Sequence, residues 1–397
     1  MKNKSADGLR GVAAFNVVTT HFIASFLPTL LHKNYPSLFP VQAAPGSLFQ
    51  ILAFPLTTVF YNGHFPVLLF FALSGYVLTL PYFADDHPGP ILQQRVWGRY
   101  LRLNIPIAAA IVLSYAVYRL GLYANVQAAA VSGSVHWLAT FYPDGIPVLT
   151  MVREALYESI VMGKGTFIPP LWTLRVEFLG SLYVLAFCLL KPRGRTALPM
   201  LFVFLLLYAV YQQESIYFYV IFAGAMLNVV RPGRKAMLAM AVAGLYFGCF
   251  QFESPVYDFL PSLQVSDVQL WEKKDFYNAV GAVLLTAAVI RGFGERFFEY
   301  RLIQFLGRIS FPLYLTHFIV LCSLACRMYL HFPQSHLYLA LEFVVYVCVC
   351  ILLASIFERY IDKNAIRLAH RATSRLFGTQ SRSKEPAPMS GKSDLVA

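Results

Sequence analysis

An arginine and a histidine stand eleven residues apart in the first apolar segment of the chain, at Arg10 and His21. At about 100° and 1.5 Å per residue, a helix would place both side chains on nearly the same face, about 16 Å apart. Ionisable side chains are expensive inside a bilayer, so in a membrane helix they indicate a functional site by default. Because imidazole suits proton transfer near neutral pH, we predict that the chemistry starts at His21. The alternative is a histidine hydrogen-bonded between packed helices.

A carboxylate occurs at similar depth in a later apolar segment, IPPLWTLRVEFLGSLY. Glu177 would lie about 9 Å down that helix, which enters from the opposite side of the membrane. A buried carboxylate has to be protonated or paired, and Arg175, two residues away, would point elsewhere on the helix. We therefore expect Glu177 to pair with His21 across helices. The alternative is a protonated carboxyl group with a structural role.

A second histidine ends a polar stripe in the segment FLGRISFPLYLTHFIV. Ser310, Tyr314 and His317 follow the i, i+4, i+7 spacing of one helix face. Arg308 marks the inner end of this helix, so a basic group at the membrane edge and a histidine at depth occur here a second time. The stripe predicts the lining of a polar cavity, although packing between helices would produce the same spacing.

Two arginines, Arg99 and Arg102, share a face of the segment RVWGRYLRLNIP at the entrance of a predicted span. The positive-inside rule alone explains arginines at this membrane edge. A guanidinium also binds phosphate in a bidentate manner, so the pair fits a phosphate-bearing ligand equally well. In the preceding span, the small residues at Ser74 and Gly75 most simply permit close packing of helices.

The composition is that of a polytopic membrane protein. Hydrophobic residues make up 58% of the chain and charged residues 13%, with a mean hydropathy of +0.58, whereas soluble domains carry about 25% charged residues. Apolar windows of about 20 residues predict an all-α transmembrane bundle of about ten spans. The predicted spans are 10–31, 65–83, 103–122, 171–190, 197–212, 215–230, 236–252, 276–291, 303–329 and 337–358.

The positive charges follow this predicted topology. With both termini cytoplasmic, the inside segments hold 24 of the 32 lysines and arginines, as the positive-inside rule requires. The net charge of +12 therefore needs no nucleic-acid partner, and attraction to anionic membrane lipid is the simplest expectation. We expect a multi-pass protein of the plasma (inner) membrane without a removable signal peptide.

The chain is predicted to consist of a membrane domain, residues 1–375, and a disordered cytoplasmic tail, residues 376–397, which is rich in Ser, Pro and Lys. The segments 32–64 and 123–170 would lie outside and suit short interfacial or re-entrant helices. The six cysteines fall within or at the ends of spans, without histidine or carboxylate ligands at fixed spacing. We therefore predict no disulfide framework and no metal site.

Five blocks of the sequence together resemble the acyltransferase-3 family of integral-membrane O-acyltransferases. These enzymes acylate sugar hydroxyls of surface polysaccharides, lipopolysaccharide and related glycans. The matching blocks, in the family's order, are DGLRGVAAFNVVTTH, FFALSGY, RYLRLNIP, PPLWTLRVEF and LGRISFPLYLTHF. One mild departure is Phe311-Pro312, which stands where a Tyr-Ser pair is common.

The resemblance implies acetyl-CoA or another acyl-CoA as donor, a glycan or glycolipid as acceptor, and no metal. His21 would be the general base on the acceptor hydroxyl, with Glu177 setting its orientation or acidity, unless a covalent acyl-histidine forms. The residues expected to bind the donor are Arg10, Arg99, Arg102 and Arg308. Those expected to bind the substrate are Trp172, Ser310, Tyr314 and His317.

Two other classes of protein share this topology. A secondary transporter or glycan exporter could use His21, Glu177 and His317 as a proton relay. The absence of a visible sequence repeat and the arginine pairs at one face argue against it. A purely structural membrane adaptor would leave the histidine and the carboxylate at mid-bilayer without an explanation.

Overall fold

The computed structural model describes residues 3–41, 48–84, 89–190, 197–265 and 268–377. It is a helical bundle. Within these residues, the β-structure is one short antiparallel hairpin. The long helices are α1 (Lys4–Phe26), α3 (His64–Ala84), α4 (Gly89–Arg119), α7 (Trp172–Leu190), α8 (Ala197–Tyr211), α9 (Ser215–Met226), α10 (Arg234–Gly248), α11 (Lys273–Val289), α13 (Arg301–Val320), α15 (His336–Phe357) and α16 (Lys363–Phe377).

Shorter elements connect them. They are η1 (Pro28–Leu31), α2 (Leu48–Leu52), η2 (Pro55–Phe60), α5 (Asn125–Ser132), η3 (Leu138–Thr140), α6 (Val148–Arg153), η5 (Pro169–Leu171), η6 (Gln212–Glu214), α12 (Glu295–Phe298), α14 (Cys326–His331), the π-helical turns η4 (Glu154–Met162), η7 (Leu321–Ala325) and η8 (Glu358–Asp362), and the strands β1 (Leu263–Val265) and β2 (Val268–Trp271). The short helices within 32–64 and 123–170 agree with the expectation for these segments.

Each of the ten predicted spans coincides with a helix, but they do not all have the length of a span. By length and composition, six segments of the described chain could cross a membrane: His64–Ala84, Gly89–Arg119, Pro169–Leu190, Pro199–Met226, Arg301–His331 and His336–Leu376. Helices α8 and α9 have 15 and 12 residues, fewer than the roughly 20 that a bilayer requires. Helix α4 begins at Gly89, well before the start of the predicted span at residue 103.

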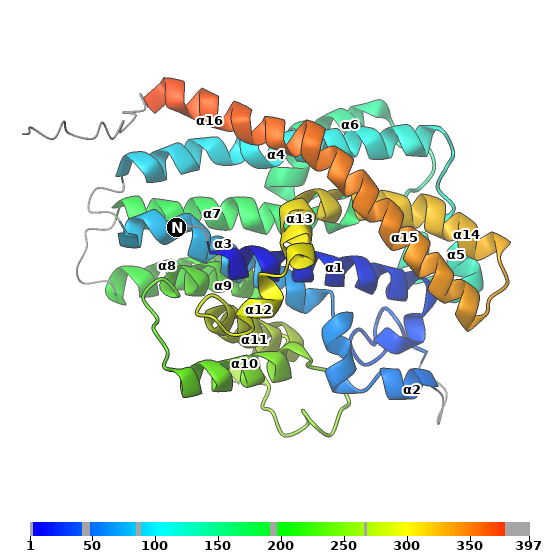
Figure 1. The fold of residues 1–397 in the computed structure, drawn as a ribbon, viewed down its shortest axis with the longest axis horizontal. Helices are drawn as coiled ribbons and strands as arrows, with labels where there is room; N and C mark the ends of the chain where they lie inside the picture. Colours follow the sequence, from blue (N-terminus) through cyan, green and yellow to red (C-terminus); the bar gives the residue numbers. More distant parts are fainter. Residues whose placement is uncertain (1–2, 42–47, 85–88, 191–196, 266–267, 378–397) are drawn as a thin grey trace, which may run out of the picture.

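The two ends of the described chain lie at the same end of the bundle. In Figure 1 the start of α1 and the end of α16 are both on the left, whereas α2, α5 and α14 are on the right. Helix α16 ends at Phe377, so most of the predicted tail, residues 378–397, lies outside the described residues.

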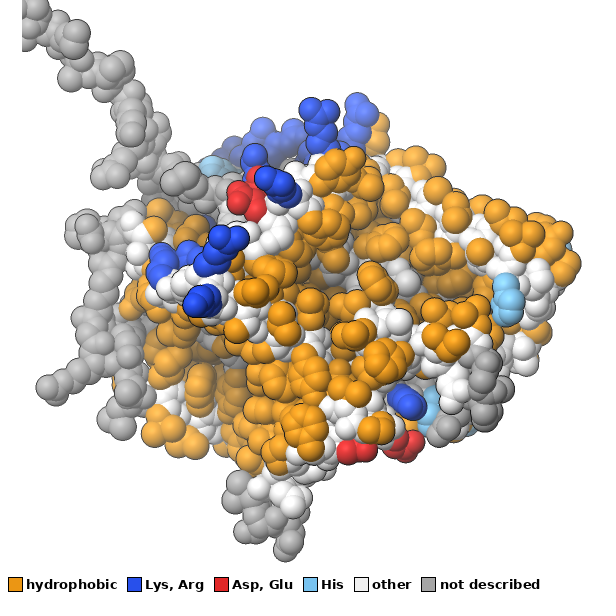
Figure 2. Space-filling view, turned by 60° about the horizontal axis from the view of Figure 1, so that its bottom comes forward, with side chains coloured by type: hydrophobic (Ala, Val, Ile, Leu, Met, Phe, Trp, Pro, Cys, Tyr) orange, Lys and Arg blue, Asp and Glu red, His pale blue; other side chains and the backbone are white. Residues whose placement is uncertain are grey.

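The surface matches a lipid environment. Figure 2 shows a broad hydrophobic face, with lysine and arginine side chains gathered toward one edge. Helices α8 and α15 expose large apolar side chains such as Phe202 (66%) and Leu337 (68%). Large exposed apolar patches mark an interaction surface, and here they include α15, which with 22 residues is long enough to span a bilayer. The protein is a membrane protein.

Glycines set the helix crossing that matters most for the site. A Cβ on Gly11 of α1 would lie 2.4 Å from the backbone nitrogen of Gly307 in α13, and one on Gly307 would lie 2.3 Å from the Asp7 carbonyl oxygen. Only glycine permits this approach of two backbones. Arg10 and Arg308 each stand next to one of these glycines. The crossing therefore brings the two arginines to the same cavity.

Helices α3 and α9 touch in the same way. A Cβ on Gly75 would lie 1.8 Å from the Ile221 carbonyl oxygen, which confirms that the small residues of this span serve close packing. The packing also fixes the rotation of α3, and with it the direction of the neighbouring Ser74.

Candidate active site

Two histidines from distant parts of the chain meet inside the bundle. His21 Nδ1 in α1 lies 2.7 Å from His317 Nε2 in α13, and His317 Nδ1 lies 2.9 Å from the Leu313 carbonyl oxygen. His317 is fully buried, whereas His21 is partly exposed. The rings of Trp137 and Phe318 each lie 5.5 Å from the His21 ring, centroid to centroid. His21 is thus held on several sides and open on one.

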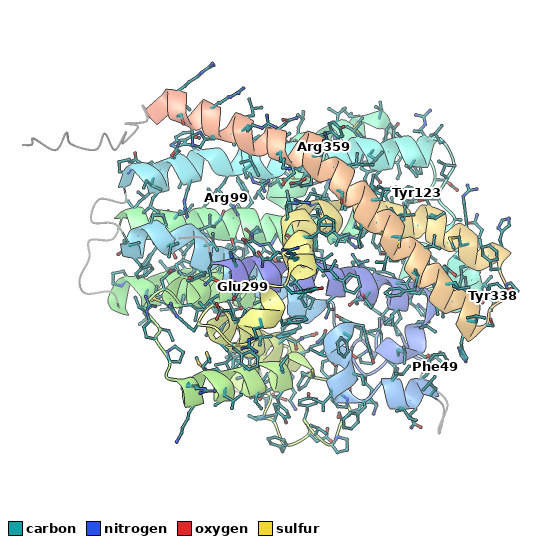
Figure 3. The ribbon with its side chains drawn as sticks, viewed as in Figure 1. Phe49, Arg99, Tyr123, Glu299, Tyr338 and Arg359 are labelled. Carbon is teal, nitrogen blue, oxygen red and sulfur yellow. The ribbon has the colours of Figure 1, made fainter. Side chains whose placement is uncertain are left out.

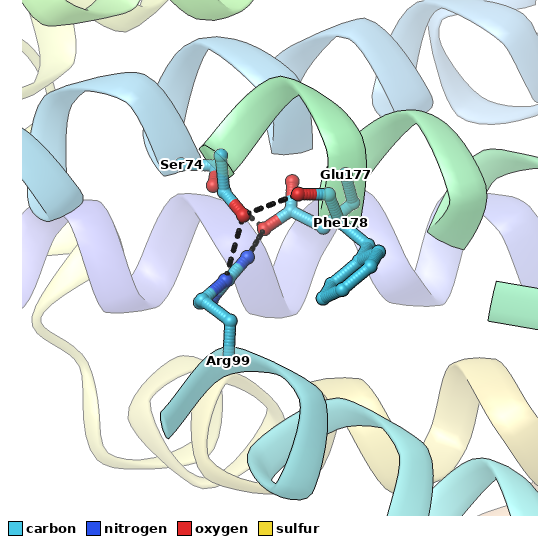
Figure 4. A network of polar contacts seen from close by, with 5 residues as sticks. Ser74, Arg99, Glu177 and Phe178 are labelled. Carbon is cyan, nitrogen blue, oxygen red and sulfur yellow. Dashed lines mark hydrogen bonds and ion pairs between the residues drawn. The ribbon is translucent and has the colours of Figure 1, made fainter. Parts of the chain in front are cut away.

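Glu177 has other partners than the sequence predicted. Its Oε1 accepts hydrogen bonds from Ser74 Oγ at 2.6 Å and from Arg99 Nη2 at 2.5 Å. Figure 4 shows Ser74, Arg99 and Glu177 in this network, and Arg99 Nε also donates to Ser181 Oγ at 2.9 Å. The expected pairing of Glu177 with His21 is therefore wrong. The reason is the rotation of α7, which directs the carboxylate toward α3 and α4, where a guanidinium satisfies it better than a neutral imidazole can.

The four predicted donor-binding arginines line one cavity of about 200 Å³. They come from three helices: Arg10 from α1, Arg99 and Arg102 from α4, and Arg308 from α13. Two carboxylates, Glu177 and Asp362, also line it, so four positive charges face two negative ones. Figure 3 shows Arg99 in the half of the molecule that holds the start of α1. We call this space the arginine cavity.

The four arginines differ in how far their charge is already neutralised. Arg99 is paired with Glu177, and Arg102 Nη1 lies 2.6 Å from Asp362 Oδ1. Arg308 Nε is 4.0 Å from Glu358 Oε1, a carboxylate that Lys363 Nζ approaches more closely, at 3.1 Å. Within the described part of the chain, no carboxylate pairs with Arg10. Arg10 and Arg308 therefore supply most of the uncompensated positive charge.

A second cavity, of about 450 Å³, contains His21. A third of its 21 lining residues are Phe, Tyr or Trp, and we call it the aromatic cavity. The aromatic lining residues are Tyr35, Phe39, Trp137, Phe141, Trp172, Tyr314 and Phe318. Polar groups are few, among them His64, His136 and Thr20. Trp172 lies here, and its contact with substrate stays a prediction. The sequence prediction missed Trp137 and the two further histidines, and the only signal for them was the aromatic-rich composition of the segments 32–64 and 123–170.

A thin wall separates the two cavities. Val67, Thr173 and Tyr314 line both of them. The Tyr314 hydroxyl lies 2.6 Å from Thr173 Oγ1 and donates to the Pro170 carbonyl oxygen at 3.1 Å. Tyr314 thus occupies the position between the arginines on one side and His21 on the other.

The predicted stripe on α13 divides by location. Ser310 lines the arginine cavity and Tyr314 both cavities, which confirms a polar cavity along this helix. His317 lines neither cavity and contacts His21 instead, and its predicted contact with substrate stays a prediction. Its side chain is fully buried. Ser74, for which the sequence favoured a packing role, lines the arginine cavity and hydrogen-bonds Glu177.

No group of three or more histidine, cysteine, aspartate or glutamate side chains within the described residues could hold a metal ion. The chemistry that these groups can perform is proton transfer at His21 and binding of anions by the arginines.

The chain is similar to known proteins over nearly its whole length. The model of the acyltransferase domain family matches residues 3–359. The chain is 22% identical over 444 aligned residues to the O-acetyltransferase PaAT-1 of Phomopsis amygdali, an alignment that covers 94% of this chain and 85% of that protein. No solved structure shows a significant match.

Proposed function

Because the chain belongs to the acyltransferase-3 family and is thus an O-acyltransferase enzyme, we propose that it transfers an acyl group, in the simplest case acetyl, from acyl-CoA to a hydroxyl of a glycan or glycolipid. In this proposal the arginine cavity receives the donor and the aromatic cavity receives the acceptor. His21 is the general base. The observation that carries the proposal is the wall that both cavities share, with His21 beside it and the arginines behind it.

The arginine cavity suits the nucleotide end of an acyl-CoA. That end carries several phosphate charges, which arginine binds through bidentate, charge-assisted hydrogen bonds. Arg10 and Arg308 would make the main contacts, since Arg99 and Arg102 already have carboxylate partners. We propose that this end of the bundle faces the cytoplasm of a plasma (inner) membrane, where acyl-CoA is present and where the positive-inside rule places basic residues.

The aromatic cavity suits the acceptor. A largely apolar and aromatic pocket with a few polar groups is the usual form of a small-molecule site. The aromatic rings can cover the apolar face of a sugar ring, while His64, His136 and Thr20 supply hydrogen-bonding groups for its hydroxyls. The acceptor would enter from the end opposite to the donor.

The proposed reaction is a direct transfer. His21 Nε2 takes the proton from the acceptor hydroxyl as its oxygen attacks the thioester carbonyl carbon. The carbon–sulfur bond of the tetrahedral intermediate then breaks, and the leaving thiolate takes the proton from His21. The products are the acyl ester and CoA thiol. For the thioester to reach His21, the wall at Tyr314 and Thr173 has to open.

Glu177 has a different role from the one that the sequence suggested. It holds Arg99 and Ser74 in place, and its Oε2 is buried without a hydrogen-bond partner in the described residues. This oxygen is free to accept a hydrogen bond from an amide N–H of the donor's pantetheine arm. We propose that Glu177 binds the donor rather than orienting His21.

The experiment that tests the proposal is acyl transfer in membranes containing the protein. Radiolabelled acetyl-CoA is supplied with a panel of isolated glycans and glycolipids, and the labelled product is separated from the protein. The proposal expects label on an acceptor as an ester that mild base removes. Label that stays covalently bound to the protein after acceptor is added, or no acceptor-dependent product at all, would contradict direct transfer to a hydroxyl.

A further inference from the structure

A chain of hydrogen bonds fixes where the protons of the two histidines lie. A backbone carbonyl oxygen can only accept, so the 2.9 Å contact with Leu313 places a proton on His317 Nδ1. A neutral imidazole then carries its lone pair on the other nitrogen. His317 Nε2 faces His21 Nδ1 at 2.7 Å, and His21 Nδ1 therefore has to donate. The remaining lone pair of His21 lies on Nε2.

The ring geometry supports a well-aligned hydrogen bond. The two imidazoles are nearly coplanar, with an angle of 9° between their planes and 5.0 Å between centroids. Because this separation roughly equals the 2.7 Å between the nitrogens plus two ring radii, the rings lie edge to edge and do not stack face to face. Hydrogen bonds are strongest when donor, hydrogen and acceptor are nearly in line.

His317 can act on the site through its hydrogen bond with His21. It is fully buried, and it lines neither cavity. Among the described residues, the partner recorded for its Nε2 is His21. Its hydrogen bond toward the site therefore runs to the His21 ring, and its aromatic neighbours are Tyr314 and Phe318.

We infer that His317 is a positioning residue that holds His21 in the tautomer with a free Nε2, the atom that acts as base in the proposed function. Without this acceptor, the His21 ring could carry its proton on Nε2 and would present a donor to the acceptor hydroxyl. When His21 takes a proton during the reaction, its bond to His317 becomes charge-assisted and stronger. The inference rests on the proposed role of His21 and extends it to a residue that touches no substrate.

The test compares two replacements of His317. His317→Phe keeps an aromatic ring but removes the acceptor, and we expect kcat to fall on the order of 10²-fold or more, as loss of the correct tautomer does in other enzymes. The KM for acyl-CoA should stay unchanged, because His317 is outside the arginine cavity. His317→Gln offers an oxygen near the position of Nε2 and should restore part of kcat.

A matched control comes from the adjacent residue. Thr316 is also fully buried on α13, and its hydroxyl donates to the Pro312 carbonyl oxygen at 2.9 Å. Thr316→Val removes one buried hydrogen bond from the same turn without touching His21. Its kcat should stay within about threefold of wild type. An equal loss of activity in Thr316→Val and His317→Phe would show that damage to α13, and not the tautomer, causes the effect.

Nitrogen-15 NMR of histidine-labelled protein gives a second readout. The His21 signals, assigned by their loss in His21→Gln, should show a proton on Nδ1 in the wild type and a population with the proton on Nε2 in His317→Phe. Full kcat in His317→Phe, or a proton on His21 Nε2 in the wild type, would overturn the inference. It would leave the proposed function intact as long as His21→Ala is inactive. Activity in His21→Ala would instead remove the proposed function itself.

Discussion

The arginine cavity and the aromatic cavity lie on two sides of one wall and are built in opposite ways. The first gathers four guanidinium groups and neutralises two of them with carboxylates from α7 and η8. The second is rich in aromatic residues, and its partly exposed His21 is held by the His317 ring. One cavity is suited to bind a charged molecule, and the other to move a proton at His21.

The difference between the two cavities shows where the bundle places charged side chains. In an apolar bundle, a charge is tolerated only when it is paired or reaches water. The arginines satisfy this condition at the edge of the bundle, with help from Glu177 and Asp362. In the described residues around His21, no carboxylate contacts the imidazole, which keeps the interior site neutral until a proton arrives. The predictions below test this division.

The largest effect is expected at His21. His21→Ala should lower acyl transfer by about 10²–10⁴-fold, the usual cost of losing a general base, with membrane abundance near normal. The assay is ester formation from labelled acyl-CoA. His331→Ala, which changes an exposed histidine in α14, is the control and should keep full activity. Wild-type turnover by a well-inserted His21→Ala protein would remove His21 from the mechanism.

The ion pair between Arg99 and Glu177 should matter for stability. Their side chains are 12% and 16% exposed, and removing one partner of a buried pair costs about 3 kcal/mol or more. Arg99→Ala should therefore lower the melting temperature of the purified protein. The double variant Arg99→Ala/Glu177→Gln should recover much of the loss, because it leaves no uncompensated charge.

A second ion pair of α7 is the matched control for this effect. Arg175 pairs with Glu214, whose side chain is 52% exposed, and exposed pairs contribute only about 0–1 kcal/mol. Arg175→Ala should change the melting temperature much less than Arg99→Ala. Equal effects of the two replacements would contradict the distinction between a buried and an exposed pair.

The third prediction separates the free arginines from the paired ones. Arg10→Gln should raise the KM for acyl-CoA about tenfold with little change in kcat, since contacts to phosphates far from the carbonyl bind ground state and transition state alike. Arg10→Lys should rescue it only in part. Arg327→Gln, whose guanidinium bonds backbone carbonyls near Leu122, should leave KM unchanged. If Arg10→Gln lowered only the affinity for the acceptor, the assignment of Arg10 to donor binding would be wrong.

A smaller effect is expected at the wall. Tyr314→Phe removes the hydroxyl that contacts Thr173 and Pro170, a loss of about 1 kcal/mol. Water from the aromatic cavity should then reach the thioester more easily, and hydrolysis of acyl-CoA without acceptor should rise a few-fold. Tyr346→Phe is the matched control, because the buried Tyr346 hydroxyl has no hydrogen-bond partner in the described residues. Unchanged hydrolysis in Tyr314→Phe would mean that the hydroxyl does not seal the wall.

The last prediction concerns orientation and should leave activity unaltered. Gln93 in α4 and Gln127 in α5 are both exposed and belong to opposite ends of the bundle. In a background without the native cysteines, Gln127→Cys should react with an impermeant thiol reagent in intact cells, and Gln93→Cys only after permeabilisation. The reverse pattern would turn the arginine cavity away from cytoplasmic acyl-CoA.

Some site residues could be identified from sequence because their chemistry is unusual for their surroundings. Arg10, His21 and Glu177 stand out in apolar segments, and each of them lines a cavity. Ser74 could not be recognised, since a small residue in a span is typical of helix packing. The aromatic wall was equally hidden, because tryptophan and phenylalanine are common throughout a chain with 16% aromatic residues.

The sequence by itself determined the helices and the kinds of group that they carry, because both follow from local composition and spacing. The partners of those groups were decided only by the tertiary structure. His21 meets His317 across 296 positions of the chain, and Glu177 turns to Arg99 rather than to His21. A helix can rotate about its axis without changing its own sequence pattern, and that rotation is fixed by contacts such as the one between Gly11 and Gly307. Which polar groups face each other is therefore a property of the packed bundle, which no single segment contains.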